Sequence, residues 1–172
     1  MNYQGLFDGE ELLALARLDI QKGSVDAALA KLKQALLDSA APIEAALETA
    51  RVYAQLGLRH KAKPLYERYL SERSGDWDAK FQLGMLCFES GESLEAMRLW
   101  DEVLASVPVH PPALFYKGLW LAESRRGEEA ASVLESLLRQ VDSENLYFGR
   151  TQTLLRSIKE GTVGERPAAR LQ

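Results

Sequence analysis

The chain has 172 residues, of which 47% are hydrophobic and 27% are charged, the balance of a globular domain or of a single repeat array. Its 21 Lys and Arg against 25 Asp and Glu give a formal net charge of −4, which argues against nucleic-acid binding through clustered cations. One cysteine excludes an intramolecular disulfide, and the two widely separated histidines argue against a metal site. We therefore expect no cofactor.

Neither a secretory signal nor a membrane span is predicted. The first residues combine no basic segment with a long apolar stretch, and no run approaches the roughly 18 apolar residues of a transmembrane helix. We therefore expect a cytoplasmic protein with no direct membrane insertion.

The predicted secondary structure begins with a pair of helices after an N-terminal extension of residues 1–8. Asp8 followed by Glu11 has the spacing of a capping box, which predicts a helix that starts near Gly9. Apolar residues at i, i+3 and i+4 spacing then indicate two amphipathic helices within residues 9–42. They are Leu12, Leu15 and Ala16 in the first helix and Ala28, Leu29, Leu32, Ala35 and Leu36 in the second.

The pattern of this helix pair recurs with a period of 34 residues. Alanines of the second helices, small residues of the first helices and glycines of the turns keep the spacing: Ala28, Ala62, Ala96 and Ala130; Ala16, Ala50, Gly84 and Gly118; Gly23, Gly57 and Gly91. Such a period predicts four repeats that bury their apolar faces against one another, at residues 9–42, 43–76, 77–110 and 111–142. In the fourth repeat Arg125 replaces the turn glycine, and we expect Gly127 to shape that turn.

A further helix is expected at residues 144–160, with one apolar side formed by Leu146, Tyr147, Leu154, Leu155 and Ile158. We expect it to cap the open end of the array; the alternative is that it lies in the groove. Residues 144–149 also look like an engineered protease-cleavage linker without its glutamine, but the helical pattern runs through them and favours a native segment. Residues 161–172, rich in Gly, Pro, Arg and Glu, are expected to form a flexible tail.

The repeats closely resemble the tetratricopeptide repeat (TPR) over residues 9–142. The third repeat matches best, through Leu83, Gly84, Gly91, Ala96, Trp100 and Pro108. The first repeat departs most, with Asp19 where the family usually has an aromatic residue, as expected of a solvent-facing terminal repeat. No segment alternates like a strand, so we predict an all-α fold. The resemblance implies a right-handed α-solenoid of helix-turn-helix repeats.

The resemblance also implies a concave groove lined by the first helices of successive repeats. The family's ligand-facing positions correspond here to Leu13, Arg17, Leu47, Arg51, Gln55, Phe81, Met85, Phe88, Phe115, Tyr116 and Leu119. Arg17 and Arg51 would make one half of the groove basic, and the remaining large side chains would make the other half apolar and aromatic. The alternative for these aromatic residues is that they belong to the core or are covered by the C-terminal helix.

The sequence contains no phosphate loop, nucleophile motif or paired metal motif, so we do not expect an enzyme. We predict a non-catalytic adaptor or scaffold that binds a partner peptide or helix in the concave groove. The alternative is a dedicated cytoplasmic chaperone, similar to the small acidic TPR chaperones of secreted or assembling proteins, for which no residue motif is specific. A third alternative is a subunit that forms homo-oligomers through the ends of the array.

Overall fold

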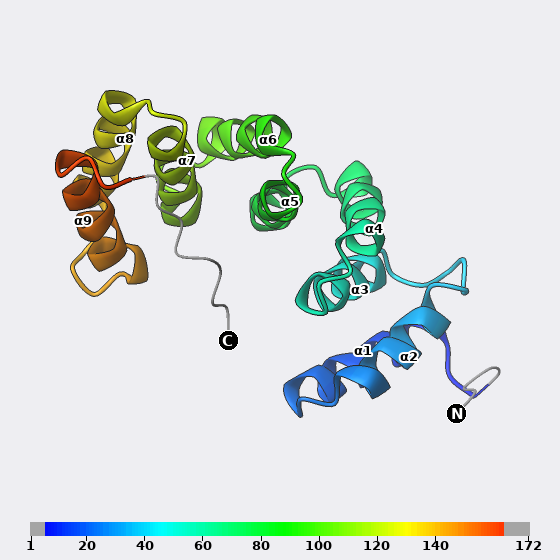
Figure 1. Ribbon diagram of the computed structural model, residues 1–172. Coiled ribbons are helices and arrows are strands. Elements are labelled where there is room, and N and C mark those ends of the chain that lie inside the picture. Colours follow the sequence, from blue (N-terminus) through cyan, green and yellow to red (C-terminus); the bar gives the residue numbers. More distant parts are fainter. Residues whose placement is uncertain (1–5, 164–172) are drawn as a thin grey trace. The chain divides into compact units, whose positions relative to one another are not determined.

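The computed structural model describes residues 6–163, in which all regular secondary structure is α-helical (Figure 1). This confirms the all-α fold class predicted from the sequence. Residues 1–5 of the expected N-terminal extension and residues 164–172 of the expected tail lie outside the described part of the chain. None of the helices within residues 6–163 combines the length and the apolar character needed to cross a bilayer.

The chain divides into two compact units, an N-terminal unit, Met1–Glu92, and a C-terminal unit, Ser93–Gln172. The boundary between them falls inside the predicted repeat 77–110. The helices of the N-terminal unit are α1 (Gly9–Gln21), α2 (Val25–Ala35), α3 (Glu44–Gln55), α4 (Arg59–Glu72) and α5 (Trp77–Glu89). Within this unit each helix from α1 to α4 packs against the next one along the chain, and α1 also contacts α3.

A capping box determines where α1 begins. The Asp8 side chain accepts a hydrogen bond from the Glu11 backbone N–H at 2.8 Å, and the Glu11 side chain accepts one from the Asp8 backbone N–H at 3.0 Å. Two amide groups that the start of a helix would leave without partners are thereby satisfied. The capping box predicted from the spacing of these two residues is confirmed.

The small residues of the 34-residue pattern lie at the helix pairs of the N-terminal unit. Ala16 and Ala28, on α1 and α2, are fully buried in one apolar cluster with Leu32. Ala50 and Ala62, on α3 and α4, are fully buried as well. Because an alanine carries little side-chain bulk, the two helices of each pair can approach closely, and larger side chains fill the space beside the contact.

A polar contact joins α1 and α2 at the position where the first repeat departs from the family pattern. Asp19 of α1 forms an ion pair with Lys31 of α2, and Lys31 is only 9% exposed. The same positions of the fourth repeat hold Leu121 and Val133, so the ion pair stands where another repeat has an apolar pair. Asp19 is therefore not simply a solvent-facing residue, because its carboxylate compensates the charge of a buried lysine.

The C-terminal unit contains α6 (Ser93–Ser106), α7 (Pro111–Glu123), α8 (Gly127–Gln140) and α9 (Leu146–Lys159). His110 caps α7, because its Nδ1 accepts a hydrogen bond from the Ala113 backbone N–H at 3.2 Å. At Gly118 α7 lies close to α8, because a Cβ atom on this residue would lie 2.5 Å from Leu134 Cδ2. A side chain at Gly118 would therefore force Leu134 to shift, whereas the equivalent positions of the first two repeats hold Ala16 and Ala50.

The turn between α7 and α8 is shaped by a residue other than the expected one. Arg125 has a φ of 61°, close to the φ of 72–84° that Gly23, Gly57 and Gly91 adopt in the earlier turns. Gly127 instead begins α8. The expectation that Gly127 shapes this turn is wrong, because Arg125 keeps the 34-residue register and itself adopts the left-handed conformation that disfavours a residue with a Cβ.

The helix α9 packs against α7 and α8 within the C-terminal unit (Figure 1). Leu154 and Ile158 of α9 pack on a cluster of buried residues, Leu121, Ala122 and Ala130. Leu155 is buried too, but Leu146 is 66% exposed. The expectation that Leu146 belongs to the apolar side is therefore wrong: α9 begins at this residue, and its side chain remains in solvent.

Candidate functional site

The predicted groove residues of the N-terminal unit divide into buried and accessible side chains. Leu13, Leu47 and Phe81 are 4%, 5% and 6% exposed, so little of their surface is open to a partner. The accessible residues are Arg17, Arg51 and Gln55, which are exposed, and Met85 and Phe88, which are half-buried. This surface is therefore mainly polar on α1 and α3 and apolar only on α5.

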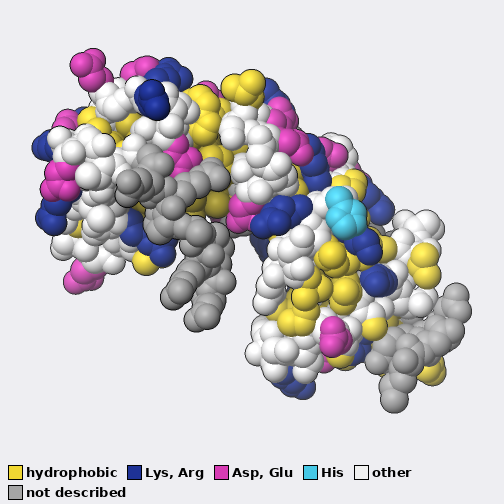
Figure 2. Space-filling view, viewed as in Figure 1, with side chains coloured by type: hydrophobic (Ala, Val, Ile, Leu, Met, Phe, Trp, Pro, Cys, Tyr) yellow, Lys and Arg dark blue, Asp and Glu magenta, His cyan; other side chains and the backbone are white. Residues whose placement is uncertain are grey.

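The two arginines of this surface share one carboxylate. Arg17 Nε lies 3.1 Å from Glu48 Oε1, and Arg51 Nη1 lies 3.7 Å from Glu48 Oε2. Burial raises the pKa of Tyr66 to about 12; Arg51 opposes this rise, and Glu48 adds to it. The expected basic half of the groove is thus partly neutralised by Glu48. Figure 2 shows cationic and anionic side chains interspersed over the visible face of the molecule.

A row of aromatic rings crosses the C-terminal unit from α6 over α7 to α9. The ring centroids of Trp100 and Tyr116 are 5.9 Å apart, those of Tyr116 and Phe115 are 5.4 Å apart, and those of Phe115 and Tyr147 are also 5.4 Å apart. Burial raises the pKa of Tyr147, and the neighbouring Tyr116 adds to this effect. The contact of Tyr147 with Phe115 shows that the segment resembling a linker is part of the folded unit.

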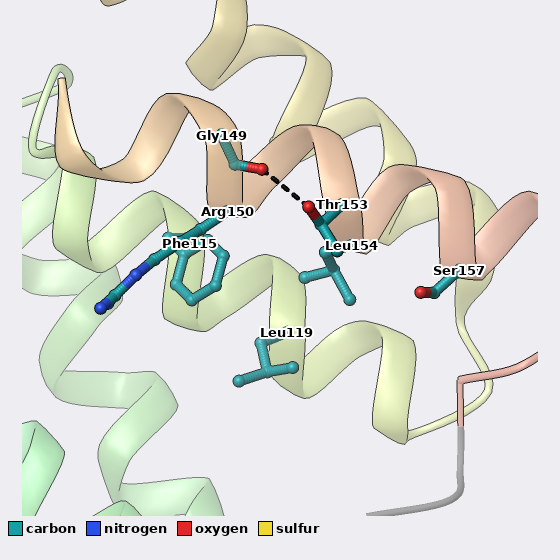
Figure 3. Close-up of a pocket in the computed structure, with 7 residues that line it drawn as sticks. All are labelled: Phe115, Leu119, Gly149, Arg150, Thr153, Leu154 and Ser157. Atoms are coloured by element: carbon teal, nitrogen blue, oxygen red, sulfur yellow. Dashed lines mark hydrogen bonds between the residues drawn. The ribbon is translucent and has the colours of Figure 1, made fainter. Parts of the chain in front are cut away.

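An open hollow lies between α7 and α9, beside this row of rings. Its volume is about 510 Å³, and it is lined by Phe115, Leu119, Gly149, Arg150, Thr153, Leu154 and Ser157. Figure 3 shows the side chains of Phe115 and Leu154 between the two helices, with Leu119 one turn further along α7 than Phe115. The Thr153 hydroxyl donates a hydrogen bond to the Gly149 carbonyl at 3.0 Å. We call this site the α7–α9 hollow.

Two of the predicted groove residues, Phe115 and Leu119, line the α7–α9 hollow, and Tyr116 is half-buried beside them. The wall on α9 was not predicted, although the sequence contains a signal for it. Gly149 and Thr153 follow Phe115 and Leu119 by 34 residues, so the first-helix positions of the fourth repeat continue in register into α9. Treating α9 as the first helix of a fifth repeat would have identified this wall.

Arg150 is the charged residue of the α7–α9 hollow. It is exposed, and within residues 6–163 no carboxylate forms an ion pair with it. Its guanidinium carbon lies 5.8 Å from the centre of the Tyr147 ring, a cation–π distance. The hollow therefore combines an apolar floor, formed by Phe115, Leu119 and Leu154, with one positive charge at its edge.

Another hollow, of about 410 Å³, lies in the N-terminal unit where α4 meets α5. Its cations are engaged: Arg59 Nε lies 3.1 Å from Glu89 Oε2, and Lys63 pairs with Glu92, which raises the pKa of Lys63. This hollow therefore offers no free cation to an anionic ligand. In the described part of the chain, no three His, Cys, Asp or Glu side chains are grouped so that they could hold a metal ion.

The repeat pattern and the paired helices agree with a match to a known family. Residues 47–100 and 89–145 match the sequence profile of the tetratricopeptide repeat, and together they cover more than half of the chain. The chain belongs to the TPR family. TPR arrays are generally interaction scaffolds that present extended surfaces to other proteins. No curated protein matches the chain in sequence.

Solved structures of other TPR proteins have the same fold. A TPR protein from Parabacteroides merdae is 20% identical, with a TM-score of 0.77 over 89% of this chain and 60% of its own. MamA from Desulfovibrio magneticus RS-1 is 17% identical (TM-score 0.72, covering 88% and 89%), and YrrB is 20% identical (0.67, covering 88% and 80%). These similarities show an all-α solenoid of helical repeats. The chain spans less than two thirds of the first of these proteins.

Proposed function

We propose that this TPR protein is a non-catalytic interaction module that binds a peptide or helical segment of a partner protein in the α7–α9 hollow. The observation that carries the proposal is the accessible apolar floor of this hollow, formed by Phe115, Leu119 and Leu154. These side chains are half-buried rather than buried, so they keep apolar surface that a partner can cover.

Burial of this apolar floor by a partner can supply enough free energy for binding. Each apolar partner side chain that becomes buried contributes roughly 1.5–3 kcal/mol by area, before the entropy cost of association is subtracted. A volume of about 510 Å³ is comparable to the sites that proteins use for small ligands, roughly 300–1,000 Å³. Among the structural relatives, YrrB is described as a TPR protein with an unusual peptide-binding site, which supports this class of ligand.

The accessible groove residues of the N-terminal unit form a second part of the proposal. We infer that Arg17, Arg51, Gln55, Met85 and Phe88 contact partner proteins as a surface of their own. Leu13, Leu47 and Phe81 of the predicted groove contribute little to this surface, because almost none of their area is open.

The α7–α9 hollow can be filled without removing any contact that stabilises the fold. A Cβ atom on Gly149 would meet no atom within 4 Å, and leucine is a better helix former than glycine. Peptides selected from a random dodecamer display library on the wild-type protein should therefore bind Gly149→Leu at least about tenfold more weakly, because the leucine occupies their place. Gln152→Leu, an exposed position of α9 that does not line the hollow, should bind them normally.

If Gly149→Leu binds the selected peptides as the wild type does, the α7–α9 hollow is not the binding site. Helical circular dichroism and thermal melting of both variants show whether their folds are intact. Once a partner protein is identified, co-expression separates the two roles predicted from the sequence: an adaptor's partner is soluble alone, whereas a chaperone's partner is soluble only with this chain. A cytoplasmic location and self-association through the array ends remain predictions.

A further inference from the structure

We propose that the segment bound in the α7–α9 hollow carries an acidic side chain, Asp or Glu, next to its apolar anchors, and that Arg150 binds this carboxylate. The inference rests on the proposed function and names the chemistry of the partner. An apolar anchor alone would fit many sequences, whereas an adjacent acidic residue would restrict the choice.

Arg150 differs in its ion pairing from other cations on the first helices of the repeats. Arg17 and Arg51 share Glu48, and Lys117 of α7 lies 2.5 Å from Asp101. Arg150 lines the hollow, yet no carboxylate of residues 6–163 pairs with it. A partner carboxylate would therefore meet an available guanidinium, without first displacing an intramolecular acid.

The surroundings of Arg150 strengthen such a contact. Its guanidinium lies over the Tyr147 ring at 5.8 Å, which restricts its orientation, and the Phe115 ring packs against the same tyrosine. In Figure 3 the Arg150 side chain extends from α9 along the Phe115 ring. Apolar walls lower the effective dielectric constant, so an ion pair formed here is stronger than one in open solvent. A guanidinium also matches a carboxylate with two parallel hydrogen bonds.

The charges along the hollow also predict where the acidic residue of the bound segment lies. The helix α9 has three cations, Arg150, Arg156 and Lys159, and no acidic residue between Leu146 and Lys159. On α7, Glu123 lies eight residues beyond Phe115, about 12 Å further along the helix. Arg150 lines the hollow and Arg156 and Lys159 do not, so the acidic residue of the partner should lie beside Phe115 and Arg150, away from the carboxylate of Glu123.

A charge reversal with a matched control tests this inference. Random dodecamer libraries are selected in parallel on the wild type, on Arg150→Glu and on Arg156→Glu. Arg156 is another exposed arginine of α9, and it does not line the hollow. The wild type and Arg156→Glu should enrich peptides with Asp or Glu within one helical turn of Leu, Phe or Trp. Arg150→Glu should lose the acidic preference and bind the wild-type peptides about five- to tenfold more weakly.

The outcomes separate the inference from the function on which it rests. If the wild type selects apolar peptides without acidic enrichment, or if Arg150→Glu retains that enrichment, the acidic partner is ruled out while the α7–α9 hollow remains a binding site. If no peptide is enriched on the wild type, the proposed function fails and the inference fails with it. Synthetic peptides with amidated C-termini should bind as well as free acids; a requirement for the free acid would assign the contact to a terminal carboxylate and overturn the inference.

Discussion

Arg17 of α1 and Glu48 of α3 form an ion pair between two neighbouring repeats, with 3.1 Å between Arg17 Nε and Glu48 Oε1. The two residues are 31 positions apart, and Glu48 also lies 3.7 Å from Arg51. The carboxylate is largely buried, with 14% of its side chain exposed, whereas the arginine is about half exposed. This contact reduces the positive charge that the sequence predicts for the inner face of the N-terminal unit.

The strength of this ion pair can be measured with a double-mutant cycle. Arg17→Ala and Glu48→Ala, combined and singly, should give a coupling free energy of about 0.5 kcal/mol in urea unfolding at low salt, because the arginine remains in solvent. In 1 M NaCl the coupling should nearly vanish, since the Debye length falls to about 3 Å. A coupling that persists in high salt would mean that packing, rather than charge, links the two side chains.

The buried ion pair of Asp19 and Lys31 should be less stable than the apolar pair found in another repeat. Asp19→Leu alone should lower the free energy of unfolding by about 2–3 kcal/mol, because it removes the carboxylate that pairs with the buried Lys31. Asp19→Leu with Lys31→Val copies the fourth repeat and should restore wild-type stability or exceed it. If the double variant is as unstable as the single one, the ion pair contributes net stability that an apolar pair cannot replace.

Two buried threonines, Thr49 and Thr151, differ in whether the side-chain hydroxyl has a hydrogen-bond partner, so they allow a matched comparison of its effect on stability. Within the described residues, Thr151 Oγ1 is buried without a hydrogen-bond partner, whereas Thr49 Oγ1 donates to the Ala45 carbonyl at 2.7 Å. Thr151→Val should raise the free energy of unfolding by about 1 kcal/mol, because it removes an unsatisfied hydroxyl from the interior. Thr49→Val should lower it by about 0.5–1.5 kcal/mol. Equal effects in chemical denaturation would indicate that an internal water satisfies Thr151.

The left-handed conformation of Arg125 should make glycine preferable at this position. Arg125→Gly relieves the steric cost of a Cβ at a φ of 61° and should stabilise the protein by about 1 kcal/mol. Ser124→Gly, one residue earlier at a φ of −82°, should destabilise it, because it only adds freedom to the unfolded chain. Melting temperatures that fall in both variants would show that the Arg125 side chain makes a stabilising contact.

Tyr66 should make the stability of the fold depend on alkaline pH. Burial raises its pKa from 10 to about 12, so the neutral phenol favours the folded state. Its contribution is fully present below pH 10 and is lost as the pH rises through 12, a change of about 2–3 kcal/mol. Tyr66→Phe cannot ionise and should lose less stability over this interval. Urea unfolding at several pH values between 9 and 12 measures the difference, and identical curves for both proteins would contradict it.

The helices and their register could be predicted from the sequence. Helix periodicity and the 34-residue spacing depend on the local chain, and they identify Ala16, Ala28, Gly118 and the capping residue Asp8 without knowledge of the tertiary fold. The same register reaches Gly149 and Thr153, so even the wall on α9 follows from the spacing. The turn at Arg125 was assigned to the wrong residue, because propensity favoured the nearby Gly127 over the register.

Only the tertiary structure decided which charges of the groove are paired and which of its side chains are accessible. Glu48 neutralises an arginine of another repeat, and Phe81 is buried although its helical position resembles that of the half-exposed Phe115. Both properties depend on which side chains of other helices lie within a few ångströms. The sequence by itself determined which face each helix turns inward, since a repeating local pattern suffices for that. Whether Arg17 or Arg150 remains available to a partner depends on contacts between residues far apart in the chain.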